Sequence, residues 1–519
     1  MLTRRRLLQG GIAAGSLFLP ASFAWVWAQS DGATRLMRAP KVALVIGNSA
    51  YRNVETLLNP GNDARAIAAA LAAAGFAVTT VLDGSRERML EAMRAHVDAL
   101  AARKAVGLFY FAGHGLQLAW RNYLVPVEAA LGKVEDVPAR CVDVGELIGG
   151  IKRAANPMNV IILDACRDNP FARELRVEAR GLSQMDAPPG TLLAYATAPG
   201  NLASDGGGAH GLYTENLLRE MAVREAPIED VFKRVRLGVR LASRGAQIPW
   251  ESTSLEEDFH FYPPEKLVLL SREQVDHAFL KERTLFEAAR DSADVVRLQE
   301  YLRLYPSGHY AEIAQLLLDR GLAAQGEKRV EAAPTAGNPN TLGSARADTL
   351  FKVGDHYRYR LRDLRLGKER ELSQRVTAVS NHEVSFNNGR ALLDPLGNVI
   401  VNRDGLRFTP RQDVPLDYVV GKRWTTRYDV IAGGTGTVEL DLRIVAREPL
   451  TVPAGTFDCF RIEARGNNTV MFRPPVEITL TFWRAPEIVR RPIAFEEKRY
   501  LNQQVVSWQR QDLLSFKQG

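Results

Sequence analysis

The sequence predicts an α/β domain with a mostly parallel sheet, then a short helical hairpin, then a C-terminal antiparallel all-β domain. The chain has 519 residues, which is too long for a single hydrophobic core, so we expect several domains. Residues 40–262 alternate apolar runs with amphipathic stretches, a pattern typical of a parallel sheet covered by helices on both faces. Residues 348–519 carry short runs of β-branched and aromatic residues separated by glycine-containing turns, which favours antiparallel strands.

The elements of the α/β domain follow from the period of its apolar residues. Five apolar runs are predicted as strands: 41–46, 76–82, 106–112, 160–163 and 192–196. Five stretches with helical spacing lie between or after them: 62–74, 85–102, 143–154, 213–223 and 228–242. In open sheets of this kind, sites form beyond the carboxyl ends of the strands.

The remaining segments are predicted from composition and turn signals. Residues 265–323 are expected to be helical, with a turn over 301–311 that resembles a single tetratricopeptide-type hairpin. Residues 325–347 are rich in Ala, Pro, Gly and Asn and are predicted as a linker. The β domain is predicted as an interaction or packing module, with strands at 357–361, 375–379, 399–401, 423–430, 437–445, 460–464, 477–483 and 493–500.

Residues 1–28 are predicted to be an export signal rather than part of the fold. A run of three arginines, Arg4 to Arg6, precedes an uncharged apolar stretch that ends at Val-Trp-Ala28, a pattern typical of a twin-arginine signal peptide with cleavage before Gln29. We therefore expect the protein to be exported, periplasmic or secreted; an uncleaved membrane anchor is the alternative. The formal net charge of +7 is too small to indicate a nucleic-acid partner.

The strongest chemical signal is a histidine and a cysteine, each at the end of an apolar run. His114 follows the third predicted strand and Cys166 follows the fourth, 52 residues later. Neighbouring ends of parallel strands would place an imidazole beside a thiol, and a histidine can activate a cysteine as a nucleophile for acyl transfer. Each residue alone also has a structural interpretation, His114 in a glycine-flanked turn and Cys166 as a core thiol. No third residue is predicted to orient His114.

The other cysteines and the acidic residues do not predict a metal or a cofactor. Cys141 and Cys459 lie in apolar stretches and are expected to be buried and inert. Three cysteines do not suggest a disulfide framework, and no Cys/His group has zinc spacing. No acidic cluster has recognisable calcium spacing, so we predict no cofactor and leave calcium dependence open.

Seven segments, taken together, resemble the caspase-like cysteine peptidases, in particular the bacterial metacaspase-like proteins (orthocaspases). They occur in the family's order at 43–48, 59–64, 109–115, 122–126, 162–171, 195–200 and 247–251. The resemblance implies a caspase-like fold with a mostly parallel six-stranded sheet between helices, and endopeptidase activity. It also implies a catalytic dyad of His114 and Cys166, with the backbone N–H groups of Gly115 and Cys166 forming the oxyanion hole.

Three acidic residues indicate which substrates the pocket would accept. Asp164 lies two residues before the nucleophile, Asp63 matches an acidic pocket residue of metacaspases, and Asp205 stands where aspartate-specific caspases have an arginine. Converging carboxylates would repel an acidic side chain and suit arginine or lysine. Two structural alternatives stay open: Asp63 as a charge at a helix N-terminus, and Asp205 as a residue of a glycine-rich loop.

The sequence therefore predicts a cysteine endopeptidase that cleaves protein or peptide substrates after basic residues. The alternative is an inactive scaffold with the same fold, whose helical hairpin and β domain bind a protein partner. Arg173, Arg176 and Arg180 follow the nucleophile and would be sites of self-cleavage in an arginine-specific enzyme, because exposed loops are preferred cleavage sites.

Overall fold

The computed structural model describes residues 31–166, 171, 181–199, 201, 208–264, 270–333, 335, 337–431, 436–470 and 473–519. The predicted signal 1–28, Asp205 and the three arginines at 173, 176 and 180 lie outside these residues. The chain divides into two compact units. The first contains the residues up to Ala278 together with Arg303–Ser307 and Leu322–Gly343, and the second contains Phe279–Leu302, Gly308–Gly321 and Ser344–Gly519.

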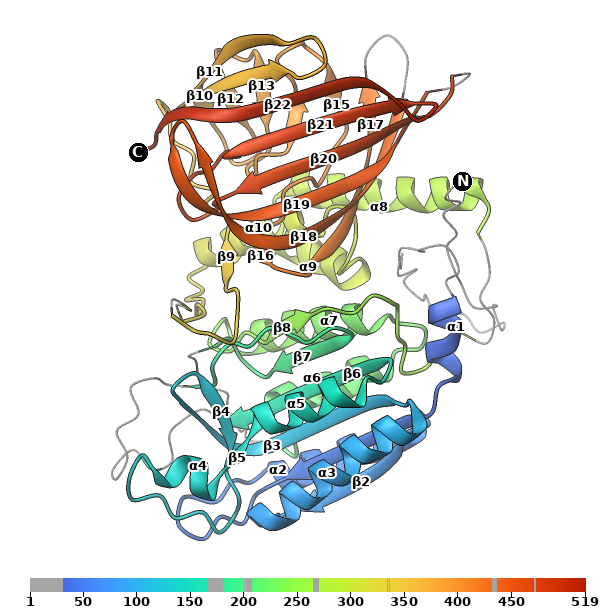
Figure 1. The fold of residues 1–519 in the computed structure, drawn as a ribbon, viewed down its shortest axis with the longest axis vertical. Helices are drawn as coiled ribbons and strands as arrows, with labels where there is room; N and C mark the ends of the chain where they lie inside the picture. Colours follow the sequence, from blue (N-terminus) through green and yellow to red (C-terminus); the bar gives the residue numbers. More distant parts are fainter. Residues whose placement is uncertain are drawn as a thin grey trace. The chain divides into compact units, whose positions relative to one another are not determined.

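The first unit has the predicted fold class, a mostly parallel sheet with helices on both faces (Figure 1). Its main strand order is β2-β1-β3-β6-β7-β8, with β8 antiparallel to β7 and the other neighbours parallel. The strands are β1 (Lys41–Gly47), β2 (Ala77–Leu82), β3 (Val106–Leu118), β6 (Met158–Cys166), β7 (Thr191–Tyr195) and β8 (Trp250–Thr253). Two short strands, β4 (Arg121–Leu124) and β5 (Val142–Asp143), extend the sheet from the far end of β3.

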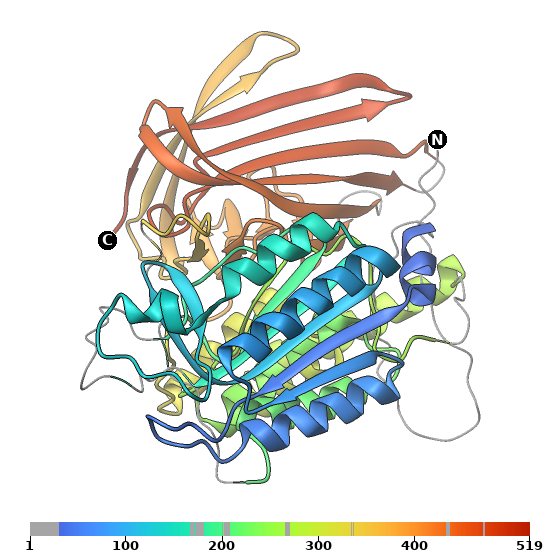
Figure 2. The same cartoon turned by 60° about the horizontal axis from the view of Figure 1, so that its bottom comes forward.

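The helices of this unit cover the two faces because the strands are apolar on both sides. The helices are α1 (Asp31–Arg38), α2 (Pro60–Ala73), α3 (Arg86–Arg103), α4 (Asp136–Arg140), α5 (Val144–Ala154), α6 (Leu212–Met221) and α7 (Ile228–Ala242). Along β1, Ala43 and Val45 pack with α2, α6 and α7, whereas Leu44 and Ile46 pack with α3 and α5. Figure 2 shows α3 and α5 crossing one face of the sheet. This alternation gives the unit two hydrophobic layers.

Three helices follow in the chain: α8 (Arg272–Ser292), α9 (Val295–Leu304) and α10 (Ala311–Ala324). The turn predicted over 301–311 lies between α9 and α10. Part of the predicted linker 325–347 is attached to the first unit, since the Ala333 amide donates to the Pro199 carbonyl at 2.8 Å and Asn338 Nδ2 donates to the Gln184 carbonyl at 2.8 Å. Its last residues form β9 (Ser344–Arg346), which pairs with β16 (Asp417–Val419) in the second unit.

The predicted antiparallel all-β domain is a closed barrel of twelve strands in the described residues. Its interior is apolar because every second residue of a strand points inward: along β18, Val438, Leu440, Leu442 and Ile444 are buried. In chain order the barrel strands are β10 (His356–Asp363), β11 (Lys368–Val379), β12 (Val384–Phe386), β13 (Ala391–Leu393), β14 (Val399–Val401), β15 (Arg407–Phe408), β17 (Arg423–Ile431), β18 (Gly436–Val452), β19 (Gly455–Val470), β20 (Val476–Arg484), β21 (Ala494–Leu501) and β22 (Gln504–Lys517).

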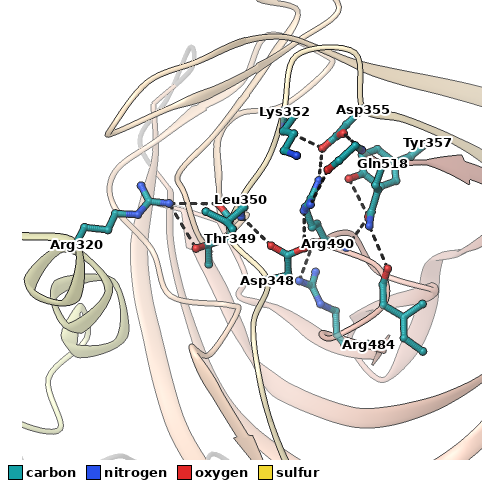
Figure 3. Close-up of polar contacts among 12 residues, drawn as sticks. Arg320, Asp348, Thr349, Leu350, Lys352, Asp355, Tyr357, Arg484, Arg490 and Gln518 are labelled. Atoms are coloured by element: carbon teal, nitrogen blue, oxygen red, sulfur yellow. Dashed lines mark hydrogen bonds and ion pairs between the residues drawn. The ribbon is translucent and has the colours of Figure 1, made fainter. Parts of the chain in front are cut away.

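A buried ionic network joins the ends of this barrel's chain (Figure 3). The guanidinium of Arg490 contacts Asp348 through Nε at 2.7 Å and Asp355 through Nη1 at 2.6 Å. Gln518 accepts the Arg490 backbone N–H at 2.9 Å and the Tyr357 hydroxyl at 3.1 Å. The network therefore connects the segment before β10 and the segment after β22 to one loop, the loop between β20 and β21 that contains Arg490.

Candidate active site

The two predicted catalytic residues lie at adjacent positions on neighbouring strands. β3 and β6 pair in parallel, and the register places His114 opposite Cys166. Cys166 is the last residue of β6, and its backbone position is described while its side chain is not. The sequence predicts that the third strand ends before His114, but β3 continues to Leu118, and only its parallel pairing with β6 ends at this pair. The pair therefore stands at the carboxyl end of the parallel pairing, where sites form in open α/β sheets.

The His114 imidazole is buried and has a fixed hydrogen-bond acceptor. His114 is 5% exposed, and its Nε2 lies 3.0 Å from the carbonyl oxygen of Glu55. A carbonyl can only accept, so this contact places the proton on Nε2. In a neutral imidazole Nδ1 is then the basic nitrogen. The sequence predicts no residue that orients His114; the orienting group is this backbone carbonyl.

Tyr51 holds His114 from two sides. Its ring packs against the imidazole with centroids 4.5 Å apart, and its hydroxyl accepts the backbone N–H of His114 at 2.7 Å. Gly113 makes this approach possible: its φ is +150°, and a Cβ at this position would lie 2.5 Å from the Tyr51 hydroxyl oxygen. The glycine before the histidine is thus required by the contact between tyrosine and backbone.

The loop after β1, which carries Tyr51 and Glu55, is anchored at its beginning. One carboxylate oxygen of Asp83 accepts the backbone N–H groups of Ser49 and Ala50, both at 2.8 Å. The Ser49 hydroxyl in turn accepts the Gly61 N–H at 2.9 Å. These bonds fix the backbone from which the Tyr51 ring and the Glu55 carbonyl reach His114.

Gly115 is needed for close packing between β3 and β6. A Cβ at this position would lie 2.9 Å from the Cβ of Ala165 and 3.2 Å from Cδ2 of Leu182. Contacts this short would force the backbone apart, so no larger residue fits without a shift. The sequence predicts the N–H of Gly115 as an oxyanion-hole donor; the packing requires glycine there independently of that role.

Asp164, near the end of β6, is held by a chain of two hydroxyl groups. Thr214 donates to its Oδ2 at 2.6 Å. The Tyr110 hydroxyl lies 2.6 Å from the Thr214 hydroxyl and 3.3 Å from the same carboxylate oxygen. Because each hydroxyl carries one proton, the shortest contacts define the order Tyr110 to Thr214 to Asp164.

Asp63 is buried in the first turn of α2, and its residue is 2% exposed. Its carboxylate lies 2.8 Å from Nδ1 of His210 and accepts the backbone N–H of Gly211 at 3.2 and 3.3 Å. Gly211 is the residue that precedes α6. Asp63 therefore lies at two helix N-termini. It belongs to the first turn of α2, and its carboxylate also binds the N-terminus of α6.

The two carboxylates share one electrostatic environment. Burial raises the pKa of Tyr110 well above its usual value, and the negative charges of Asp164 and Asp63 raise it further. Both carboxylates also bind the start of α6, Asp63 through the backbone N–H of Gly211 and Asp164 through the hydroxyl of Thr214. The structure brings Asp63 and Asp164 into one neighbourhood, while Asp205, the third predicted pocket residue, lies outside the described residues.

Several residues of this site were not predicted from the sequence. His210 stands directly before a predicted helix and beside a glycine, which is the one local signal that could have marked it. Tyr110 and Thr214 lie in an apolar strand and helix, where they look like core residues. Glu55 acts through its backbone carbonyl, and the type of residue does not predict such a role.

The other two cysteines are unsuited to nucleophilic chemistry. Cys141 and Cys459 are both buried, and burial raises the pKa of each thiol to about 12, so both stay protonated at neutral pH. Within the described ranges, no three His, Cys, Asp or Glu side chains are grouped to hold a metal ion. In the same part of the chain, every helix is too short or too polar to cross a membrane.

Comparisons with known proteins agree with this geometry. Residues 40–260 match the family model described as the caspase domain. Over 127 residues the chain is 31% identical to human mucosa-associated lymphoid tissue lymphoma translocation protein 1, and 30% identical to its mouse homolog. Each match covers 24% of this chain and 15% of the relative, so the likeness is confined to a small part of both.

Proposed function

Since residues 40–260 belong to the caspase-like cysteine peptidase family, we propose that this protein is a cysteine endopeptidase that cleaves protein or peptide substrates after arginine or lysine. The observation that carries the proposal is the register of β3 and β6, in which His114 and Cys166 are the last pair of residues. A cysteine beside an oriented imidazole is the arrangement that acyl transfer requires.

In the proposed mechanism, Nδ1 of His114 takes the proton of the Cys166 thiol, and the thiolate attacks the scissile carbonyl carbon. The backbone N–H groups of Gly115 and Cys166 stabilise the oxyanion. His114 then gives its proton to the departing amine, which leaves a thioester on Cys166. Water, deprotonated by the same imidazole, hydrolyses this thioester and regenerates the thiol.

The proposed preference for basic residues rests on Asp63 and Asp164. Both are acidic, and both are held at the start of α6: Asp63 accepts the backbone N–H of Gly211, and Asp164 accepts the hydroxyl of Thr214. A carboxylate can bind a guanidinium through two parallel hydrogen bonds and an ammonium as a point charge. An aspartyl side chain would meet like charge in the same place.

Hydrolysis of fluorogenic peptides with arginine, lysine or aspartate before the cleaved bond tests this function. We expect turnover of the arginyl and lysyl peptides, and a loss of about 10³-fold or more in Cys166→Ala and in His114→Ala. Cys459→Ala is the matched control, because it removes a buried thiol on β19 of the barrel, outside the α/β domain that carries the proposed chemistry. Circular dichroism checks that each variant is folded.

Each outcome of this assay is informative. Activity near wild type in Cys166→Ala or His114→Ala would exclude the dyad. A folded wild-type protein that hydrolyses none of the peptides would favour the scaffold alternative. A preference for the aspartyl peptide would overturn the assignment of Asp63 and Asp164 to a cation pocket.

A further inference from the structure

The first turn of α6 holds both pocket carboxylates. His210 and the N–H of Gly211, just before the helix, bind Asp63, and Thr214, three residues further on, binds Asp164. Asp63 belongs to α2 and Asp164 to β6, which are distant in the sequence. One short segment therefore sets the position of two acidic groups from different parts of the fold.

Thr214 is the central member of this arrangement. It is fully buried, donates its one proton to Asp164 at 2.6 Å, and accepts from Tyr110 at 2.6 Å. Hydrogen bonds donated to a carboxylate favour its charged form. They also fix its plane, which matters because a guanidinium needs a correctly oriented partner to form two parallel bonds.

We propose that Thr214 is a positioning residue for charge selectivity: through its hydroxyl it orients the carboxylate of Asp164, and so sets the enzyme's preference for a cationic side chain. This inference rests on the proposed function and assigns the selectivity to α6 as well as to the acidic residues themselves. Thr214 touches no reacting atom in this scheme. Its removal therefore acts on recognition rather than on the chemical step.

The test uses Thr214→Val, which keeps the shape of the side chain and removes the hydroxyl. Two fluorogenic peptides are compared that differ only in arginine or citrulline before the cleaved bond, since citrulline has nearly the same shape without the charge. We expect KM for the arginyl peptide to rise about tenfold while kcat changes less than about twofold. The ratio of kcat/KM for arginine over citrulline then falls about tenfold.

Two further variants separate positioning from simple packing. Thr214→Ser restores the hydroxyl and should recover the arginine-to-citrulline ratio to within about twofold of wild type. Thr191→Val removes another fully buried threonine hydroxyl, at the first residue of β7, which pairs with Asn159 near the start of β6, and should leave the ratio unchanged. If Thr214→Val lowers the turnover of both peptides equally, or if Thr214→Ser fails to recover the ratio, Thr214 has no positioning role.

The failure of this inference is distinguishable from that of the proposed function. A wild-type enzyme that prefers arginine over citrulline, with the same preference in Thr214→Val, would overturn the role of Thr214 alone. A wild-type enzyme that cleaves citrulline and arginine peptides equally would overturn the cation pocket and, with it, the role of Thr214. Absence of all cleavage would overturn both, together with the assignment of the dyad.

Discussion

His96 and His114 belong to the same unit and are equally buried, both 5% exposed, but their surroundings differ. His96 lies on α3, and its Nδ1 has no hydrogen-bond partner within the described part of the chain. Burial lowers the pKa of His96 to about 4, so its ring is neutral at physiological pH. His114 instead donates from Nε2 to the Glu55 carbonyl and packs on Tyr51.

The difference shows that burial alone does not prepare a histidine for catalysis. Burial disfavours the charged imidazolium, as at His96. A fixed acceptor on one ring nitrogen decides which of the two nitrogens can accept a proton, as at His114. The neutral contacts around His114 orient the ring without adding a charge that would compete with a substrate.

The ionic network of the barrel shows a third way to bury a polar side chain, by pairing opposite charges. Arg490 is 7% exposed and Asp355 is 2% exposed. Such a pair depends strongly on both partners, because removing one leaves the other buried as an uncompensated charge. Losing one of the neutral contacts of His114 should therefore destabilise the protein far less than losing one partner of this ion pair. The same loss should lower the peptidase activity more.

The largest effect on stability is expected from Arg490→Met. The change keeps an apolar chain of similar length but leaves Asp355 buried without its cation, and it should destabilise the barrel by about 3–5 kcal/mol. Peptidase activity should stay within about twofold of wild type at temperatures where the barrel remains folded. Urea unfolding followed by fluorescence of the barrel tryptophans measures the change.

The exposed pair of Arg358 and Glu371, whose side chains are 47% and 60% exposed, is the control. Arg358→Ala should change stability by less than about 1 kcal/mol, because exposed ion pairs are screened by water and salt. An effect of Arg490→Met as small as that of Arg358→Ala would show that the buried network contributes little.

A smaller effect, dependent on pH, is expected at His96. Its pKa is about 4 in the folded protein and about 6.5 in the unfolded chain. As pH falls from 6.5 to 4, the unfolded chain therefore takes up a proton that the folded protein does not, and stability is lost. The total loss is about 3 kcal/mol, since the pKa differs by about 2.5 units between the two states and one unit corresponds to about 1.4 kcal/mol.

His96→Gln removes this titration, so its stability should depend less steeply on pH between 6.5 and 4 than that of wild type. Hydrogen exchange of the α3 amides, measured at both pH values, reports the local difference. His277→Gln replaces an exposed histidine and should follow the wild-type curve. Equal slopes for His96→Gln and wild type would contradict the assigned pKa.

The fold class was predictable because its main elements are long and periodic. The parallel strands of the sheet and most of the long barrel strands were predicted from their apolar pattern, but the long strand β22 was missed. The strands β4, β5 and β8 have only two to four residues, too few to show a period. Closure of the barrel depends on the pairing of β10 with β22, in which His356 lies opposite Lys517. A contact between residues so far apart leaves no local signal.

The candidate site was predictable where residue type carries the chemistry. His114 and Cys166 were proposed because each is a reactive residue that follows an apolar run, and Asp63 and Asp164 because they match pocket positions of the family that the sequence resembles. The Glu55 carbonyl could not be found in this way, because every residue has one. The partner of Asp63 is His210, 147 residues away, and only the folded chain brings the two together.

The most direct test of the comparison between the histidines is Tyr51→Phe, whose expected change in stability is smaller than those at Arg490 and His96. This variant keeps the ring against the imidazole but removes the hydroxyl that accepts the His114 N–H at 2.7 Å. An unsatisfied buried N–H should cost about 1–2 kcal/mol. Because the freed backbone can shift His114, we also expect kcat to fall about threefold to tenfold with little change in KM.

Tyr123→Phe, in the same hydrophobic cluster, is the matched control and should retain kcat. Equal kcat in Tyr51→Phe and wild type would show that the imidazole is held by the Glu55 carbonyl and ring packing alone.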